Sequence, residues 1–130
     1  MASALERIRT FQDELVGLRH DLHAHPEIGL ETPRTADTVA RHLKGWGIEV
    51  HRGVGGHGVV GVLRQGNGPI SIGLRADMDA LPVKEATGLA YQSEVEGRMH
   101  ACGHDGHTTK GQAAWISAPL NSPPTALTGQ

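Results

Sequence analysis

The sequence predicts an α/β fold in which helices pack on part of a sheet. Apolar residues recur at helical spacing between residues 4 and 44, and they change to short or alternating apolar runs between residues 48 and 76. Such a change of period is typical of helices followed by strands. A chain of 130 residues is long enough to bury a hydrophobic core of its own. We therefore expect one small domain that combines both kinds of element.

The first predicted helix runs from about Ala4 to His23. Apolar residues at spacings of three and four form a stripe along it: Leu5, Ile8, Phe11, Leu15, Leu18 and Leu22. A second helix is predicted from about Pro33 to Lys44, because Thr32 is a favourable N-cap and proline is favoured in the first turn. The residues expected on its buried face are Ala36, Val39, Ala40 and Leu43.

Three strands are predicted, over Ile48–His51, Val59–Leu63 and Ile70–Ala76. The sequence Gly66-Asn67-Gly68 favours a hairpin between the last two strands, because asparagine and glycine tolerate a positive φ. The glycine-rich segment Gly53–Gly58 is followed by a strand and not by a helix. It is therefore predicted to be a plain loop and not a phosphate-binding loop.

Composition excludes several classes of partner. The net charge of −2 comes without a basic stripe, which argues against nucleic acid, and no apolar run is long enough to cross a membrane. With one cysteine and no signal-peptide pattern, a cytoplasmic protein is expected. Residues 117–130 carry three prolines and few large apolar side chains. We expect a domain over residues 1–116 and a flexible tail over residues 117–130.

The motif richest in possible metal ligands spans His100 to His107 and reads HACGHDGH. A thiolate together with an imidazole suits zinc, so Cys102 and His104 are the strongest candidate ligands. A glycine-rich turn with surface histidines would account for the same residues without a metal. The spacing alone leaves both interpretations open.

Two other clusters carry polar groups that could belong to a site. Asp77 and Asp79 follow the predicted strand Ile70–Ala76, where open α/β sheets place their ligands, and Asp79 could orient a metal-bound histidine. For this cluster taken alone, solvated charge at a strand end is the favoured interpretation. His20 and His23 lie three residues apart near the end of the first helix. That spacing could chelate an ion, but it also suits the helix dipole.

Three segments in this order resemble the N-terminal signatures of the N-acyl-amino-acid amidohydrolases, a family that includes hippurate hydrolase and the auxin-conjugate hydrolases of plants. The segments are Arg19–Glu27, Gly73–Pro82 and Met99–Thr109. The resemblance implies the N-terminal part of a two-metal, exopeptidase-like catalytic domain, which a smaller dimerisation domain accompanies in homo-oligomeric complete enzymes. It also implies hydrolysis of the amide bond of small N-acyl amino acids with two divalent ions, such as zinc, manganese or cobalt.

The resemblance further implies roles for individual residues. Cys102 and His104 match the first two metal ligands of the family, and Asp79 matches the carboxylate beside the metal site. Other residues of the signatures are expected to support the site: His25, Asp77, His100, Asp105 and His107.

The sequence departs from the family after Thr109. There the family continues with a long apolar helix and a Gln-Pro-Ala-Glu-Glu type motif, whose glutamates act as general base and metal ligand. Here Lys110-Gly111-Gln112 is expected to interrupt the helix, and no such glutamate pair follows. We therefore expect an incomplete, inactive fragment. The alternatives are a small metal-binding protein and a non-catalytic module whose unfinished sheet edge pairs with another chain.

Overall fold

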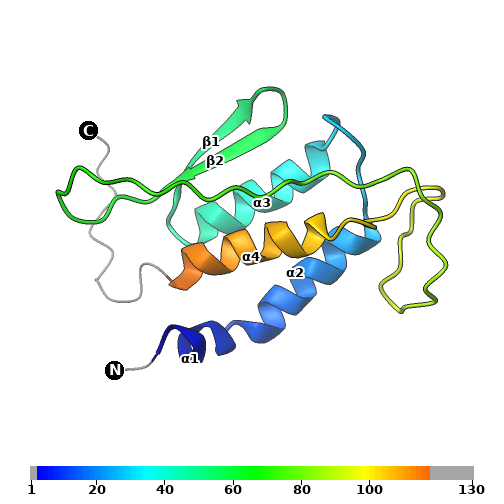
Figure 1. Cartoon of the computed structure of the whole chain (residues 1–130), viewed down its shortest axis with the longest axis horizontal. Helices are drawn as coiled ribbons and strands as arrows, with labels where there is room; N and C mark the ends of the chain where they lie inside the picture. Colours follow the sequence, from blue (N-terminus) through cyan, green and yellow to red (C-terminus); the bar gives the residue numbers. More distant parts are fainter. Residues whose placement is uncertain (1–2, 118–130) are drawn as a thin grey trace.

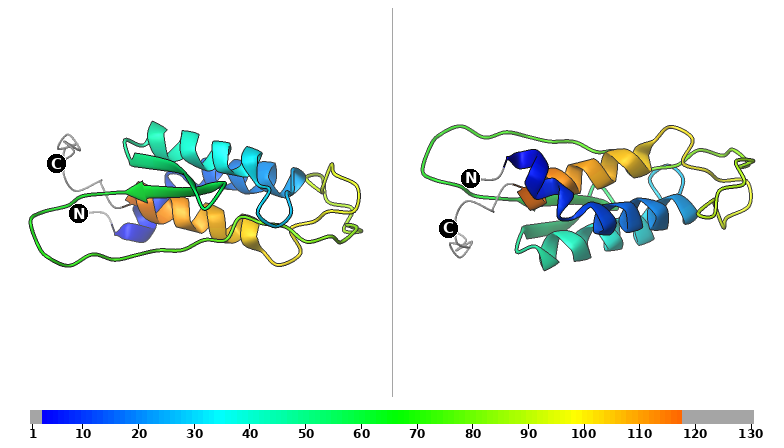
Figure 2. Two further views of the ribbon diagram at one scale, coloured as in Figure 1. Left: turned by 90° about the horizontal axis from the view of Figure 1, so that it is seen from above. Right: turned by 90° about the horizontal axis from the view of Figure 1, so that it is seen from below.

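A computed structural model describes residues 3–117 of the chain. Its elements are α1 (Ala4–Arg9), α2 (Gln12–Ala24), α3 (Pro33–Gly45), β1 (Glu49–Val54), β2 (Gly58–Val62) and α4 (His104–Ser117) (Figure 1). Helix α4 contacts both α2 and α3, and the β1–β2 hairpin covers α3 (Figure 2). Helices packed with a small antiparallel sheet confirm the predicted fold class.

The N-terminal region forms two helices, so the prediction of one helix from Ala4 to His23 is wrong. A capping box between Ser3 and Glu6 begins α1, which ends at Arg9 with Thr10 as its C-cap. The Thr10 hydroxyl donates to the carbonyl of Arg7 at 2.7 Å, and the Thr10 amide donates to the same carbonyl at 3.1 Å. A threonine hydroxyl that bonds to a nearby carbonyl competes with continuation of a helix. The helical spacing of the apolar residues therefore continues from α1 into α2, although the helix itself is broken at Thr10.

Helix α3 confirms the second predicted helix and its buried face, since Ala36, Val39, Ala40 and Leu43 are all buried. Val39 and Leu43 form a core with Ile48, and Val59 and Met78 pack against it. The sheet therefore attaches to the rest of the chain through α3.

The cap of α3 differs from the prediction. The side chain of Thr32 makes no capping hydrogen bond. Instead, the carboxylate of Glu27 accepts hydrogen bonds from the backbone amides of Arg34 at 3.0 Å and Thr35 at 2.7 Å. The Glu27 carboxylate thus caps the N-terminus of α3 from a position outside the N-cap residue. Its negative charge also interacts favourably with the helix dipole.

Replacing Glu27 with alanine is expected to destabilise the chain by about 1–2 kcal/mol, because two amides at the start of α3 lose their acceptor. Urea denaturation followed by circular dichroism measures the loss. Glu31→Ala is the matched control, since Glu31 is exposed and its carboxylate caps no helix in the described part of the chain. Equal effects of the two substitutions would contradict this account of the cap.

The strands β1 and β2 confirm the first two predicted strands and the predicted Gly53–Gly58 loop. They pair antiparallel from Glu49 opposite Val62 to Val54 opposite Gly58. The register shifts between Arg52 and Val54, where Gly53 has a φ of +77°. Glycine adopts this conformation without the steric cost that a Cβ brings.

The predicted third strand and its hairpin are wrong. Residues 70–76 are extended but unpaired, and among the described residues they make no backbone–backbone hydrogen bond. The side chains of Ile70 and Ile72 are 86% and 84% exposed. The alternating pattern favours a strand, but a strand forms only where a neighbour supplies the other half of the ladder.

Helix α4 runs through Gly111, so the expected interruption at Lys110-Gly111-Gln112 is wrong. Glycine weakens a helix by only about 1 kcal/mol relative to alanine, which packing can offset. A Cβ at Gly111 would lie 3.4 Å from the Cβ of Ala76. Glycine therefore allows the extended segment to lie close against α4. The proposed tail lies outside the described residues, except for Ser117 at the end of α4.

No helix within residues 3–117 combines the length and the apolar character that a membrane span requires.

Candidate functional site

Short backbone contacts bring the three signature segments together. The amide of Ala80 donates to the carbonyl of Glu27, which forms a parallel bridge between Ile28 and Ala80. Leu81 and Met99 exchange two hydrogen bonds of 2.9 and 3.0 Å. The chain then turns, with Gly103 at a φ of +81°, into the first residue of α4. Segments far apart in the sequence thus meet at the N-terminal end of α4.

His104 is fixed by Asp79. Its Nδ1 lies 2.9 Å from the Asp79 Oδ1 and 2.8 Å from the backbone oxygen of the same residue. Two acceptors at one ring nitrogen require that Nδ1 carries the proton, which leaves Nε2 with its lone pair. No partner of Nε2 is present between residues 3 and 117. The ring is therefore held in the tautomer that can bind an ion through Nε2.

Cys102 supplies a second possible donor, and it is exposed. A thiol and an imidazole two residues apart are suitable donors for a divalent ion. However, within the described residues no three His, Cys, Asp or Glu side chains gather closely enough to hold a metal. Cys102 and His104 therefore fit part of a metal shell and not a complete one.

Asp77 lies on the same segment as Asp79 but has a different partner. Its Oδ1 forms an ion pair with Arg75 at 2.8 Å, and its carbonyl accepts from the Thr108 hydroxyl at 3.0 Å. The Arg75 guanidinium lowers the pKa of the Asp77 carboxyl. Asp77 is thus ionised and joined to α4 through its backbone.

A buried chain of ionisable groups lies behind the first turn of α4. His23 Nδ1 lies 2.8 Å from the Asp105 Oδ2, and His23 Nε2 lies 3.0 Å from the Glu85 Oε1. The side chains of His23, Asp105 and Glu85 are 5%, 1% and 3% exposed. We call these three residues the carboxylate–histidine bridge. It ties the end of α2 and the segment around Glu85 to the start of α4.

The pKa of His23 reflects two opposed effects. Burial disfavours the imidazolium, but the hydrogen bonds to Glu85 and Asp105 outweigh it and raise the pKa. Burial likewise disfavours the Glu85 carboxylate, but hydrogen bonds from Thr87, Ser93 and His23 lower its pKa. The geometry therefore favours a charged His23 beside the Glu85 carboxylate.

The remaining predicted residues occupy distinct surroundings. His100 is 4% exposed, and neither of its ring nitrogens has a partner within the described structure. Burial lowers its pKa. The rings of His104 and His107 lie 5.5 Å apart. His25 instead contacts Asp21 and Glu94. Of the expected supporting residues, His107 is therefore adjacent to His104, whereas His25 has partners outside the Cys102–His104 pair.

Comparison with known proteins shows which family this chain is similar to. A model of the peptidase family M20/M25/M40 matches residues 73–118. The hippurate hydrolase of Campylobacter jejuni is 52% identical over 105 residues, which cover 81% of this chain and 27% of that protein. The structure of an M20 dinuclear metal-binding peptidase of Bacillus subtilis superposes on this chain with a TM-score of 0.80 and 36% sequence identity. The match covers 87% of this chain and 32% of the Bacillus subtilis chain. Residues 73–118 are thus similar to the M20 peptidase family, and most of the chain is similar to part of these two relatives.

A plant protein is also similar to this chain. An IAA-amino acid hydrolase of Arabidopsis thaliana is 41% identical, over 82% of this chain and 24% of that protein. The chain thus spans about a quarter to a third of the length of the relatives it matches. The M20 match also continues beyond Thr109 to residue 118, in agreement with the uninterrupted α4.

Sequence reasoning missed Glu85 and the role of Glu27. Glu85 lies between the second and third signature segments, in a stretch without a ligand-type pattern. His23 was expected either to chelate an ion or to interact with the helix dipole. Only the fold shows that His23 bridges two buried carboxylates, while His20 stacks on Tyr91 with ring centroids 3.7 Å apart.

Proposed function

We propose that this chain contributes part of a metal-dependent site that hydrolyses the amide bond of N-acyl amino acids. The Asp79–His104 hydrogen bond, on a motif that also carries Cys102, is the observation that supports the proposal most directly. These residues fall within the segment that the M20 model matches. The names of the relatives, hippurate hydrolase and IAA-amino acid hydrolase, favour an acyl group joined to an amino acid as substrate.

Cys102 and His104 would hold a divalent ion, for which zinc, manganese and cobalt are the candidates. When bound, such an ion acts as a Lewis acid and lowers the pKa of a coordinated water. Asp79 orients the His104 ring and increases the basicity of Nε2. His107 and Asp77 are proposed to line the same region, while Asp105 and His100 support it from behind.

Two donors fill at most half of a four-coordinate shell. Within residues 3–117, no glutamate joins Cys102 and His104 in a group that could hold a metal. Loss of a general base alone lowers rates by about 10²–10⁴-fold. The chain alone is therefore expected to show no measurable turnover.

A chimera tests the proposed function. The segment of the Campylobacter jejuni hippurate hydrolase that matches this chain is replaced by the corresponding residues of this chain, and hydrolysis of N-benzoylglycine is measured with zinc, manganese or cobalt. We expect metal-dependent hydrolysis by the chimera, its loss with a chelator, and none by the chain alone. A folded chimera without activity, beside an active parent enzyme, would contradict the proposal.

A further inference from the structure

The sequence Gly66-Asn67-Gly68 lies in the connector between β2 and the extended segment that follows it. The sequence favours a hairpin here, but in the described part of the chain β2 pairs only with β1. Figure 2 shows the connector projecting beyond the helices. Residues 64–69 are all exposed. The Asn-Gly pair therefore stands in solvent without the ladder of hydrogen bonds that a hairpin would supply.

No contact fixes the two groups that could react with each other at this pair. Among the described residues, neither the Asn67 side chain nor the Gly68 amide has a hydrogen-bond partner. The charged residue nearest along the chain is Arg64, and its guanidinium lies 3.8 Å from the Glu49 carboxylate. Segments with few contacts and a solvated backbone change conformation most easily. Asn67 can therefore rotate its side chain toward the next main-chain nitrogen.

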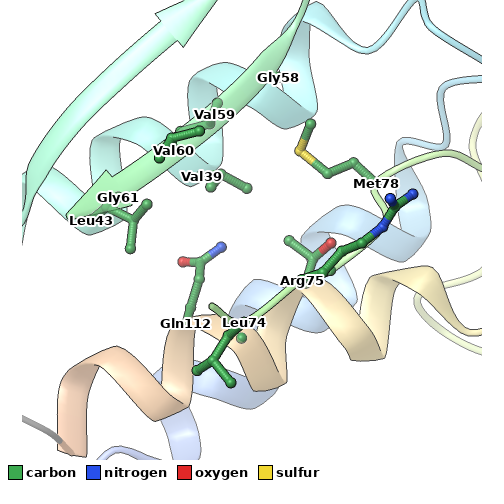
Figure 3. Close-up of a pocket in the computed structure, with 13 residues that line it drawn as sticks. Val39, Leu43, Gly58, Val59, Val60, Gly61, Leu74, Arg75, Met78 and Gln112 are labelled. Carbon is green, nitrogen blue, oxygen red and sulfur yellow. The ribbon is translucent and has the colours of Figure 1, made fainter. Parts of the chain in front are cut away.

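The cavity beside β2 does not account for this exposure. The cavity has a volume of about 250 Å³ and is lined by residues of β2, α3, α4 and the segment that begins at Leu74 (Figure 3). None of its lining residues falls between residues 62 and 73. The exposure of Asn67 thus belongs to the connector itself and does not depend on what occupies the cavity.

We propose that Asn67 is a site of spontaneous deamidation in the folded chain. The main-chain nitrogen of Gly68 attacks Cγ of Asn67, the bond from Cγ to the side-chain nitrogen breaks, and ammonia leaves with the Gly68 amide proton. Water then opens the five-membered succinimide. Opening at Cγ gives aspartate, and opening at the main-chain carbonyl carbon gives isoaspartate, in which the chain continues through the side-chain carboxyl. The reaction needs only water and does not depend on the proposed hydrolysis.

Glycine at position 68 makes the attack sterically accessible. A side chain on the residue after asparagine would crowd the nitrogen as it approaches Cγ, and glycine has no side chain. Gln65 is also exposed and is also followed by a glycine. Attack on its longer side chain has to close a six-membered ring, which is less favourable. The connector therefore contains its own comparison.

Incubation of the whole chain in mildly alkaline buffer tests the proposal. Peptide mapping by mass spectrometry follows the conversion of amide to acid at each position, and chromatography against synthetic peptides separates aspartate from isoaspartate. We expect both products at Asn67 and an unchanged amide at Gln65 over the same period. No conversion at Asn67, or conversion at Gln65 that is equally fast, would overturn the proposal.

Comparison of the folded and unfolded chains shows whether the fold protects Asn67. An exposed segment without hydrogen bonds needs no local unfolding to react, so the folded rate should lie within about threefold of the rate in guanidinium chloride. A lower folded rate would contradict the assignment, because it would mean that the fold holds the connector in an unreactive conformation.

Gly68→Ala is the matched variant. The φ of Gly68 is not positive, and a Cβ at this position would meet no heavy atom within 4 Å, so the fold should be unchanged. Circular dichroism checks that expectation. The added methyl group should slow conversion at Asn67 by about tenfold or more, in the folded and in the unfolded chain. Equal rates in the variant and the parent chain would refute attack by the Gly68 nitrogen.

Discussion

Replacement of His23 by alanine is expected to destabilise the chain by about 3–5 kcal/mol. The substitution removes the cation between the buried side chains of Glu85 and Asp105, and Asp105 keeps an ion pair with Arg19 at 3.4 Å. Removal of one partner from a buried ionic group is costly because the remaining charge cannot be hydrated. Urea denaturation followed by circular dichroism measures the change.

His20→Ala provides a control for this prediction, because His20 lies on the same helix but stacks on Tyr91. We expect a loss of about 1 kcal/mol for His20→Ala, in the range of a single ring contact. The double variant His23→Ala/Glu85→Ala should lose less stability than the sum of the losses in the two single variants. The reason is that the second substitution removes a buried carboxylate that has lost its histidine partner. Comparable effects of His20→Ala and His23→Ala would contradict the bridge.

The same bridge predicts a pH window of stability. The folded-state pKa of His23 is raised, so its contribution is fully present below the unfolded value of about 6.5 and is lost as the pH rises through the folded value. The folded-state pKa of Glu85 is lowered, so its contribution is lost as the pH falls through that lowered value. Stability from the bridge should therefore be greatest between these two pKa values. In His23→Ala, the decrease at high pH should disappear.

Asp79→Asn is expected to lower the metal affinity of the hippurate hydrolase chimera by about 10–100-fold. Asparagine keeps the shape of the side chain but removes the charge that orients and polarises His104. Calorimetric titration with zinc gives the affinity, and the retained circular dichroism spectrum reports the fold. Cys102→Ser should have a larger effect and abolish metal-dependent hydrolysis, because serine is a poorer metal donor than the thiolate that Cys102 is proposed to supply.

A matched control for Asp79→Asn is Asp77→Asn. The Asp77 carboxylate pairs with the exposed Arg75, and His104 is hydrogen-bonded to Asp79 instead. We expect Asp77→Asn to change metal affinity by less than about threefold, because surface ion pairs contribute little. An equal loss of affinity in the two variants would show that general charge near the site, and not the Asp79–His104 hydrogen bond, controls metal binding.

Local signals predicted the parts of the fold that depend on near neighbours. The spacing of Val39 and Leu43 identified the buried face of α3, and the glycines of residues 53–58 identified the loop between β1 and β2. The break at Thr10 has a local cause, a hydroxyl bonded to its own helix, but threonine also occurs within helices. The period of the apolar stripe was therefore a poor guide to that break.

Contacts between distant segments could not be predicted in this way. Residues 70–76 have the alternation of a strand, but whether they pair depends on what lies beside β2. Gly111 was expected to break a helix, whereas in the fold it makes room for Ala76. The expectation that Asp79 lies near His104 came from a family resemblance, and the structure contains that contact. The roles of both residues in metal binding remain a proposal.

The long sequence separation within the carboxylate–histidine bridge has a consequence for folding during synthesis. His23 precedes Asp105 by 82 residues, and at a translation rate of about 5–20 residues per second this interval lasts roughly 4–16 s. During this interval α2 can emerge from the ribosome before α4, the helix that packs against it, has been synthesised. The nascent chain is therefore expected to expose an apolar helix face for seconds, which makes it a substrate for ribosome-associated chaperones.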